Sequence, residues 1–194
     1  MSTNTQKTRL IADYERNMAG RLALRVLDKP KPPLWMIFVP VFFVFFAQKM
    51  RHYSKAREDF VENYVKPRGL ALDAAHDAIE TGTSPEPSRI LEKTGAIPEH
   101  SRQLFTDWMT ALTDHYRTLL AARGDTAQAL IRSGYRSKTE YLLVCNVLNR
   151  TENAFNESLM TNIEGDCQEI RSVVARMHES VTDLRRQEAD AIFG

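Results

Sequence analysis

One uncharged stretch, residues 32–47, governs how this sequence is interpreted, and it reads PPLWMIFVPVFFVFFA. Its apolar side chains show neither the 3.6-residue period of an amphipathic helix nor the alternation of a strand. A helix that is hydrophobic on all sides is typical of a membrane element or of the centre of a large core. We therefore expect a membrane segment at residues 32–50. Its anchoring side chains would be Leu34, Trp35, Ile37, Phe38, Pro40, Phe42, Phe43, Phe45 and Phe46.

The length of the apolar run leaves three interpretations open. Residues 34–47 span roughly 21 Å as a helix, which is short of the roughly 30 Å hydrocarbon core of a bilayer. In the first interpretation the flanks extend a spanning helix, with Trp35 and Tyr53 at the two interfaces. In the second the segment re-enters the membrane or lies in its plane, with Pro40 at the bend. In the third it is a buried soluble helix or an oligomer seam.

Charge is distributed unevenly around this stretch. Residues 1–31 carry a net charge of +4, residues 48–68 carry +3, and residues 69–194 carry −6. Basic flanks beside an apolar run favour contact with an anionic membrane surface. The membrane-surface set would be Lys29, Lys31, Lys49, Arg51, Lys55 and Arg57. The basic excess after the apolar run places the C-terminal body on the cytoplasmic side.

Composition narrows the class of protein. The 194 residues are 43% hydrophobic and 26% charged, which is typical of a folded chain rather than a disordered one. Two cysteines do not make a disulfide framework, and a net charge of +1 argues against a nucleic-acid partner. We expect no cleaved signal peptide, because no small-residue cleavage site follows the apolar run.

The periodicity of the remaining sequence predicts an all-α, irregular helical bundle with one short hydrophobic membrane-anchor helix. We divide it into a basic amphipathic N-terminal helix (1–31), the membrane segment (32–50), a basic juxtamembrane helix (51–68) and an acidic helical body (69–194). The stripe of residues 8–28 fits either a helix on an anionic leaflet or, slightly better, a helix on the protein's own core. Lys66-Pro67-Arg68-Gly69 is expected to end the juxtamembrane helix.

Within the body, helices are predicted at 70–81, around Ile90, from Pro98 to Gly124, at about 126–134, at 137–160 and at 166–192. Asp125 and Ser137 each begin a capping-box pattern. We expect the last two helices to form an antiparallel hairpin with a turn at residues 161–165. The alternative is a single coiled-coil helix, because the apolar spacing of four and three residues continues across the junction.

No pattern that carries chemistry is found. None of the five histidines stands in a Glu-x-x-His pair, and there is no glycine-rich phosphate loop or nucleophile elbow. Asp73 and His76 form at most a weak half-site for a metal. Cys145 and Cys167 fit small buried thiols better than metal ligands. We therefore nominate no catalytic residue, no metal site and no cofactor.

Four asparagines recur at helical spacing within the predicted helix 137–160. This stripe comprises Asn146, Asn149, Asn153 and Asn156. Asparagine has poor helix propensity, so the stripe suggests a polar seam for a partner helix or a lipid head group. The alternative is an ordinary solvated face.

These observations favour a membrane-anchored helical accessory or interaction protein without a catalytic site of its own. Its expected partners are the lipid bilayer and another protein that contacts the helical body. A monotopic enzyme acting on a lipid-linked or phosphate-bearing substrate, and a soluble module that oligomerises through the apolar segment, remain as alternatives. The sequence predicts no oligomeric state.

Overall fold

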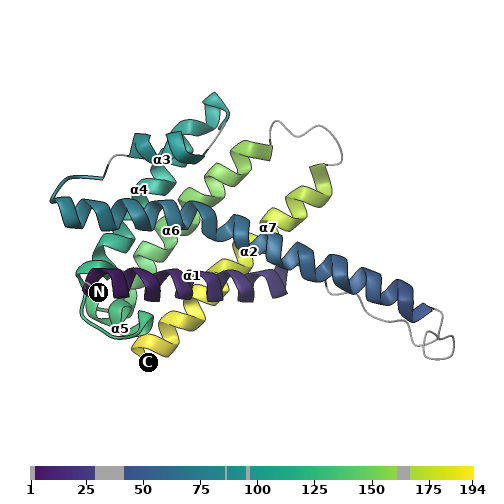
Figure 1. The fold of residues 1–194 in the computed structure, drawn as a ribbon, viewed down its shortest axis with the longest axis horizontal. Coiled ribbons are helices and arrows are strands. Elements are labelled where there is room, and N and C mark those ends of the chain that lie inside the picture. The colour runs from purple at the N-terminus through teal and green to yellow at the C-terminus, as the bar shows by residue number, and fades with distance from the viewer. Residues whose placement is uncertain (1–2, 29–41, 86, 95–96, 161–166) are drawn as a thin grey trace.

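The computed structural model describes residues 3–28, 42–85, 87–94, 97–160 and 167–194, and this part of the chain is helical without a strand (Figure 1). The predicted all-α bundle is confirmed. The described elements are α1 (Thr3–Val26), α2 (Phe42–Thr81), α3 (Pro87–Thr94), a 3₁₀ helix η2 (Glu99–Ser101), α4 (Arg102–Ala121), α5 (Ala127–Gly134), α6 (Lys138–Met160) and α7 (Cys167–Phe193).

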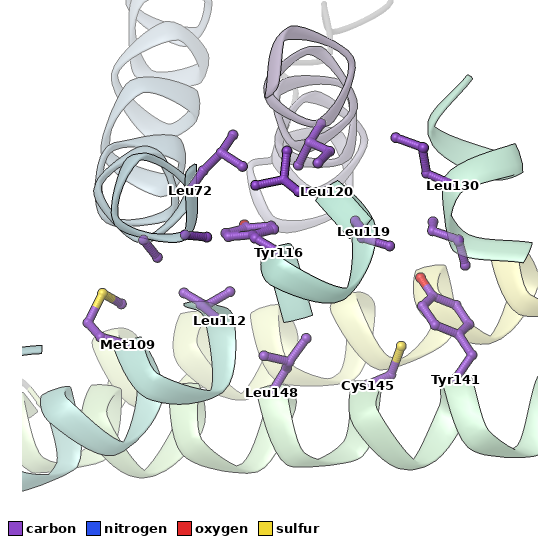
Figure 2. Packing of buried hydrophobic residues seen from close by; sticks show 14 of the residues in the cluster. Leu72, Met109, Leu112, Tyr116, Leu119, Leu120, Leu130, Tyr141, Cys145 and Leu148 are labelled. Carbon is purple, nitrogen blue, oxygen red and sulfur yellow. The ribbon is translucent and has the colours of Figure 1, made fainter. Parts of the chain in front are cut away.

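Helix α4 forms the centre of the bundle. A broad face of α4 is buried, and its centre includes Phe105, Met109, Leu112 and Tyr116. Figure 2 shows Met109, Leu112 and Tyr116 of α4 between Leu72 of α2 above and Leu148 of α6 below. Because α4 contacts α1, α2, α3, α5 and α6, it joins the helices into one core.

Helices α1 and α2 pack side by side in opposite directions (Figure 1). Near one end of the pair Asn4 donates a hydrogen bond to Glu80 at 2.8 Å, and farther along Arg16 reaches Glu62 at 2.6 Å. The predicted apolar stripe of α1 lies inside the protein, with Ile11 and Leu22 both 0% exposed. Of the two interpretations of this stripe, packing on the protein's own core is therefore the one observed.

The predicted helix end at residues 66–69 is wrong. Helix α2 continues through Pro67 to Thr81, a run of 40 residues or about 60 Å. Pro67 removes one backbone donor, but the residues that follow it bury Ala71, Leu72 and Ala75 against the core. That burial and the ion pairs of Arg68 stabilise the helix beyond the proline. Gly82, with φ of +68°, ends α2 as its position predicts.

The apolar stretch is only partly described. Residues 34–40 of the expected anchor lie outside the described residues, whereas Phe42 to Ala47 form the first turns of α2. Within the described ranges we find no helix whose apolar run would reach across a bilayer. Figure 1 shows the N-terminal end of α2 extending beyond the other helices.

The residues that cap α5 and α6 lie where the sequence predicts them, except that the cap of α5 is one residue later. Thr126, not Asp125, caps α5, and its hydroxyl accepts a hydrogen bond from the Ala129 amide at 3.1 Å. Ser137 caps α6 as predicted and accepts from the Glu140 amide at 3.2 Å. Gly124 precedes α5 at a φ of +159°, where an added Cβ would lie 2.7 Å from the Cβ of Ala129. This close approach explains the glycine at the turn between α4 and α5.

Helices α6 and α7 form the predicted antiparallel pair. Along it Lys138 pairs with Asp190, Tyr141 contacts Glu188, and Asn149 donates to Thr182 at 3.2 Å. As residue numbers rise on α6, those of their partners fall on α7, so a single continuous helix is excluded. The predicted turn itself lies outside the described residues.

Replacing Leu148 with alanine tests this packing. Leu148 is 3% exposed on the inner face of α6, and truncation would leave a cavity, so we expect a loss of about 2–5 kcal/mol in the free energy of unfolding. Urea denaturation measures it. Leu143→Ala is the control, because Leu143 lies on the same helix but is 61% exposed, and its loss should stay within about 0.5 kcal/mol. Equal losses of unfolding free energy in the two variants would contradict the burial of Leu148 in the core.

Candidate functional site

The most unusual feature of the described residues is a charged cluster inside the bundle, which we call the Arg68 network. Arg68 of α2 is 2% exposed, and its Nη2 donates to both carboxylate oxygens of Glu152 of α6, at 2.8 and 2.7 Å. Its Nε lies 3.3 Å from the carboxylate of Glu15 of α1. One guanidinium therefore joins three helices that are far apart in sequence.

Aromatic side chains complete the network. The Arg68 guanidinium lies 3.4 Å from the ring centroid of Tyr64 and 5.5 Å from that of Trp108. Tyr116 donates a hydrogen bond to Glu15 at 2.9 Å. Burial alone would lower the pKa of Arg68, but Glu152, then Tyr64 and Glu15, raise it above its ordinary value. The arginine is therefore charged at every physiological pH.

A second buried arginine, Arg185 of α7, lies next to the Arg68 network. Its Nη1 donates to the Cys145 carbonyl at 3.3 Å and to the side-chain oxygen of Asn149. Burial acts to lower the pKa of Arg185, but Cys145, Tyr64 and Glu152 outweigh burial and raise this pKa above its ordinary value. Arg185 thus fastens α7 to α6 through neutral acceptors rather than through a carboxylate at contact distance.

Glu188 of α7 lies between two tyrosines. The hydroxyl of Tyr14 donates to it, and the hydroxyl of Tyr141 lies 3.3 Å from the same carboxylate oxygen. Burial raises the pKa of Glu188, and the hydrogen bond from Tyr14 acts against that rise. The cluster connects α1, α6 and α7.

The expected membrane-surface residues have mixed surroundings. Lys29 and Lys31 lie outside the described residues, and Lys49 lies in the first turns of α2. Arg51 and Lys55 are exposed, as a surface-binding role requires. Arg57 is half-buried, with its guanidinium 5.9 Å from the ring centroid of Tyr53. Tyr53 is only 9% exposed, so it does not present the open aromatic edge expected of an interface residue.

The asparagine stripe divides among several environments. Asn149 is buried against Thr182 and Arg185, so at this position the facing helix is α7 of the same chain. Asn146 is exposed, and Asn153 donates to Glu157 at 2.8 Å on its own helix. Asn156 lines a separate groove beside α2. Asn146, Asn149 and Asn153 nevertheless line one groove between α6 and α7, whereas Asn156 lines a different one. The stripe is therefore not a uniformly solvated face, and its use as a seam for a partner remains a prediction.

Among the candidate chemical groups, Cys145, Asp73 and His76 have described surroundings. Cys145 is buried, and burial raises the pKa of its thiol, which keeps it protonated at neutral pH. The His76 ring lies 3.8 Å from Asp77, and burial raises the pKa of Asp73. Among the described residues no group of three His, Cys, Asp or Glu side chains could hold a metal ion.

The sequence does not predict these buried charges directly, because a charged residue on a helix is normally solvated. A signal was present in their spacing. Arg68 stands four residues after Tyr64 and four before Leu72, on the apolar stripe of α2. Glu152 stands between Leu148 and Phe155 in the same way on α6. A charge at a position that the period assigns to the core predicts a buried partner.

The Arg68 network holds α1, α2 and α6 together. A charged arginine between two carboxylates neither accepts nor releases a proton near neutral pH. Comparison with protein-family models, curated proteins and solved structures found no match. Function must therefore be argued from this chain alone.

Replacing Arg68 with methionine should destabilise the protein strongly. Two buried carboxylates would lose their counter-charge, a change that typically removes about 3–5 kcal/mol from the free energy of unfolding. The triple variant Arg68→Met, Glu15→Gln, Glu152→Gln removes all three charges and should recover much of the loss. Chemical denaturation at pH 7 measures both. A single variant as stable as the wild type would show that the ion pairs do not hold the helices.

His115 should make the fold sensitive to acid. Burial, and then the positive charge of Arg185, lower the pKa of His115 to about 3, and its Nδ1 forms a 2.5 Å hydrogen bond with the Tyr135 hydroxyl. Because the unfolded chain takes up this proton near its ordinary pKa of 6.5, stability is complete above that pH and falls as the pH drops toward 3.

We expect the urea midpoint of the wild type to fall between pH 7 and pH 5, and that of His115→Gln to fall less. His52→Gln is the control, because His52 is exposed. Its urea midpoint should fall between pH 7 and pH 5 by as much as that of the wild type. If the urea midpoints of His115→Gln and the wild type fell equally with pH, the acid sensitivity would not come from His115.

Proposed function

We propose that this chain is a membrane-associated helical interaction protein whose body is held at the cytoplasmic face of an anionic membrane. The observation that carries the proposal is the continuity of α2. Its first turns belong to the apolar stretch, the next carry the exposed Arg51 and Lys55, and its C-terminal half lies in the core. One element thus connects the apolar segment directly to the Arg68 network.

Two kinds of attraction would act together at this end of the protein. An apolar segment inserts by burying hydrocarbon surface, and each lysine or arginine near an anionic leaflet adds about 1 kcal/mol. Arg51 and Lys55 stand four residues apart and so share one side of α2. The body after residue 68 carries −6 and would be repelled by the same surface, which leaves it available to a protein partner.

Vesicle flotation of the full chain tests the proposal. We expect binding to vesicles of phosphatidylcholine and phosphatidylglycerol, weaker binding to phosphatidylcholine alone, and a loss of binding as salt rises. The variant Phe42→Ser, Phe43→Ser, Phe45→Ser, Phe46→Ser should fail on both vesicles. Arg51→Gln with Lys55→Gln should weaken binding to the anionic vesicles by roughly 10- to 30-fold, from about 1 kcal/mol for each charge.

The matched control removes the same charge from the body. Arg123 and Arg186 are both exposed, and Arg123→Gln with Arg186→Gln should float like the wild type. Absence of flotation on either vesicle, together with oligomers that dissociate in the four-serine variant, would overturn the proposal in favour of an oligomer seam.

A further inference from the structure

Two of the three large apolar side chains that are exposed among the described residues lie together on α6. Leu143 is 61% exposed and Val147 is 42% exposed, whereas the third, Leu24, is on α1. A single exposed apolar side chain is ordinary at a protein surface. Leu143 and Val147 stand four residues apart, so they form one apolar ridge along the outer side of α6.

This ridge borders a groove between α4 and α6, on the side of α6 away from α7. The groove has a volume of about 300 Å³, and its aliphatic lining comprises Ala111, Leu143, Val144, Val147 and Leu148. The ridge and the groove form one continuous apolar surface that is open to solvent at Leu143 and Val147. A contiguous surface of this kind is typical of an interaction site.

Charged residues bracket the ridge at equal distances. Glu140 stands three residues before Leu143, and Arg150 stands three residues after Val147. Steps of three, four and three residues keep all four side chains on one side of the helix. Arg150 is exposed, and Glu140 keeps one carboxylate oxygen besides the one that accepts from the Arg136 amide. Within the described part of the chain, neither charge has an ion-pair partner.

The spacing of these four residues is symmetric about residue 145. In an antiparallel pair of α6 helices, Leu143 of one copy therefore faces Val147 of the other, and Glu140 faces Arg150. A two-fold interface requires this reciprocity, because the same patch serves both copies. A parallel pair in register would instead place each charge against its own kind, which is unfavourable. The charges thus favour a second copy of this chain, in one orientation, as the occupant of the ridge.

We propose that the outer side of α6 is a homodimer interface, in which two copies of this chain pair antiparallel across a two-fold axis at the level of residue 145. Leu143 and Val147 of each copy pack against the ridge and groove of the other, and two Glu140–Arg150 pairs close the ends. One helix ridge buries less surface than a permanent interface does, so the dimer is reversible. The proposal does not rest on membrane binding.

Reversing one charge at a time tests the register. Analytical ultracentrifugation of the full chain, from about 1 µM to about 1 mM protein, measures the dissociation constant of the dimer. Glu140→Lys places like charges opposite each other at both ends of the interface, and Arg150→Glu does the same with the opposite sign. We expect each change to weaken dimerisation about tenfold or more, because two attractive pairs become repulsive.

An equimolar mixture of Glu140→Lys and Arg150→Glu is the decisive sample. In the mixed dimer, positions 140 and 150 again carry opposite charges at both ends, so dimerisation should return to about the wild-type level. Arg186→Glu is the matched control, because Arg186 is an exposed arginine on α7, and this variant should dimerise like the wild type. A role of either residue in folding alone would not produce recovery on mixing.

The four-serine variant separates this interface from the apolar segment. It should keep the wild-type dissociation constant and the same response to Arg150→Glu, a change that leaves the cap at Glu140 intact. Failure of flotation with an intact dimer would count against the proposed function alone. A monomer at about 1 mM protein, dimers that both charge reversals leave unchanged, or a mixture that does not recover would overturn the homodimer.

The urea midpoint provides a second readout. Because only the folded chain dimerises, the midpoint of the wild type should rise with protein concentration, and that of Arg150→Glu should rise less. The comparison of Leu148→Ala with Leu143→Ala accordingly belongs at low protein concentration, where the chain is monomeric. Equal concentration dependence in the wild type and Arg150→Glu would contradict an interface at this ridge.

Discussion

A guanidinium removed from water must have its charge compensated, and this requirement at Arg68 governs how the helices meet. The nearest compensation comes from Glu152 and Glu15, which lie on α6 and α1. Neither carboxylate can move by a helical turn without leaving a charge unpaired in the interior. The crossing of α1, α2 and α6 is therefore fixed by a few polar atoms, while α4 supplies the apolar surface around them.

The same constraint explains why α2 does not end at Pro67. Proline in a helix interior removes a hydrogen bond and is destabilising by about 3 kcal/mol, which by itself predicts a break. The following residue carries the central charge of the core, and Ala71, Leu72 and Ala75 are buried beyond it. Together these contacts outweigh the loss at one turn. The proline remains as a local defect in α2.

Much of the fold was predictable because helix periodicity and helix ends are local properties. The inner faces of α1, α4 and α6, the cap at Ser137 and the α6–α7 pair all followed from spacing and capping residues. The continuation of α2 was not predictable, since it depends on contacts with Glu15 and Glu152, which are distant in sequence. The candidate site was missed for the same reason: identifying it required knowing which charges face one another.

Buried ion pairs are weak contributors to stability compared with apolar residues of similar size, and their best-supported role is to select one arrangement among several. Sliding α1 by one turn along α2 would place Ile11 opposite Arg68 and move Glu15 to the position of Ala19, in the apolar cluster around Leu22. The apolar contacts alone would tolerate such a shift far better than the charges do. We infer that the Arg68 network sets the register of α2. Because α2 is continuous, that register also determines the direction in which Arg51 and Lys55 point from the bundle.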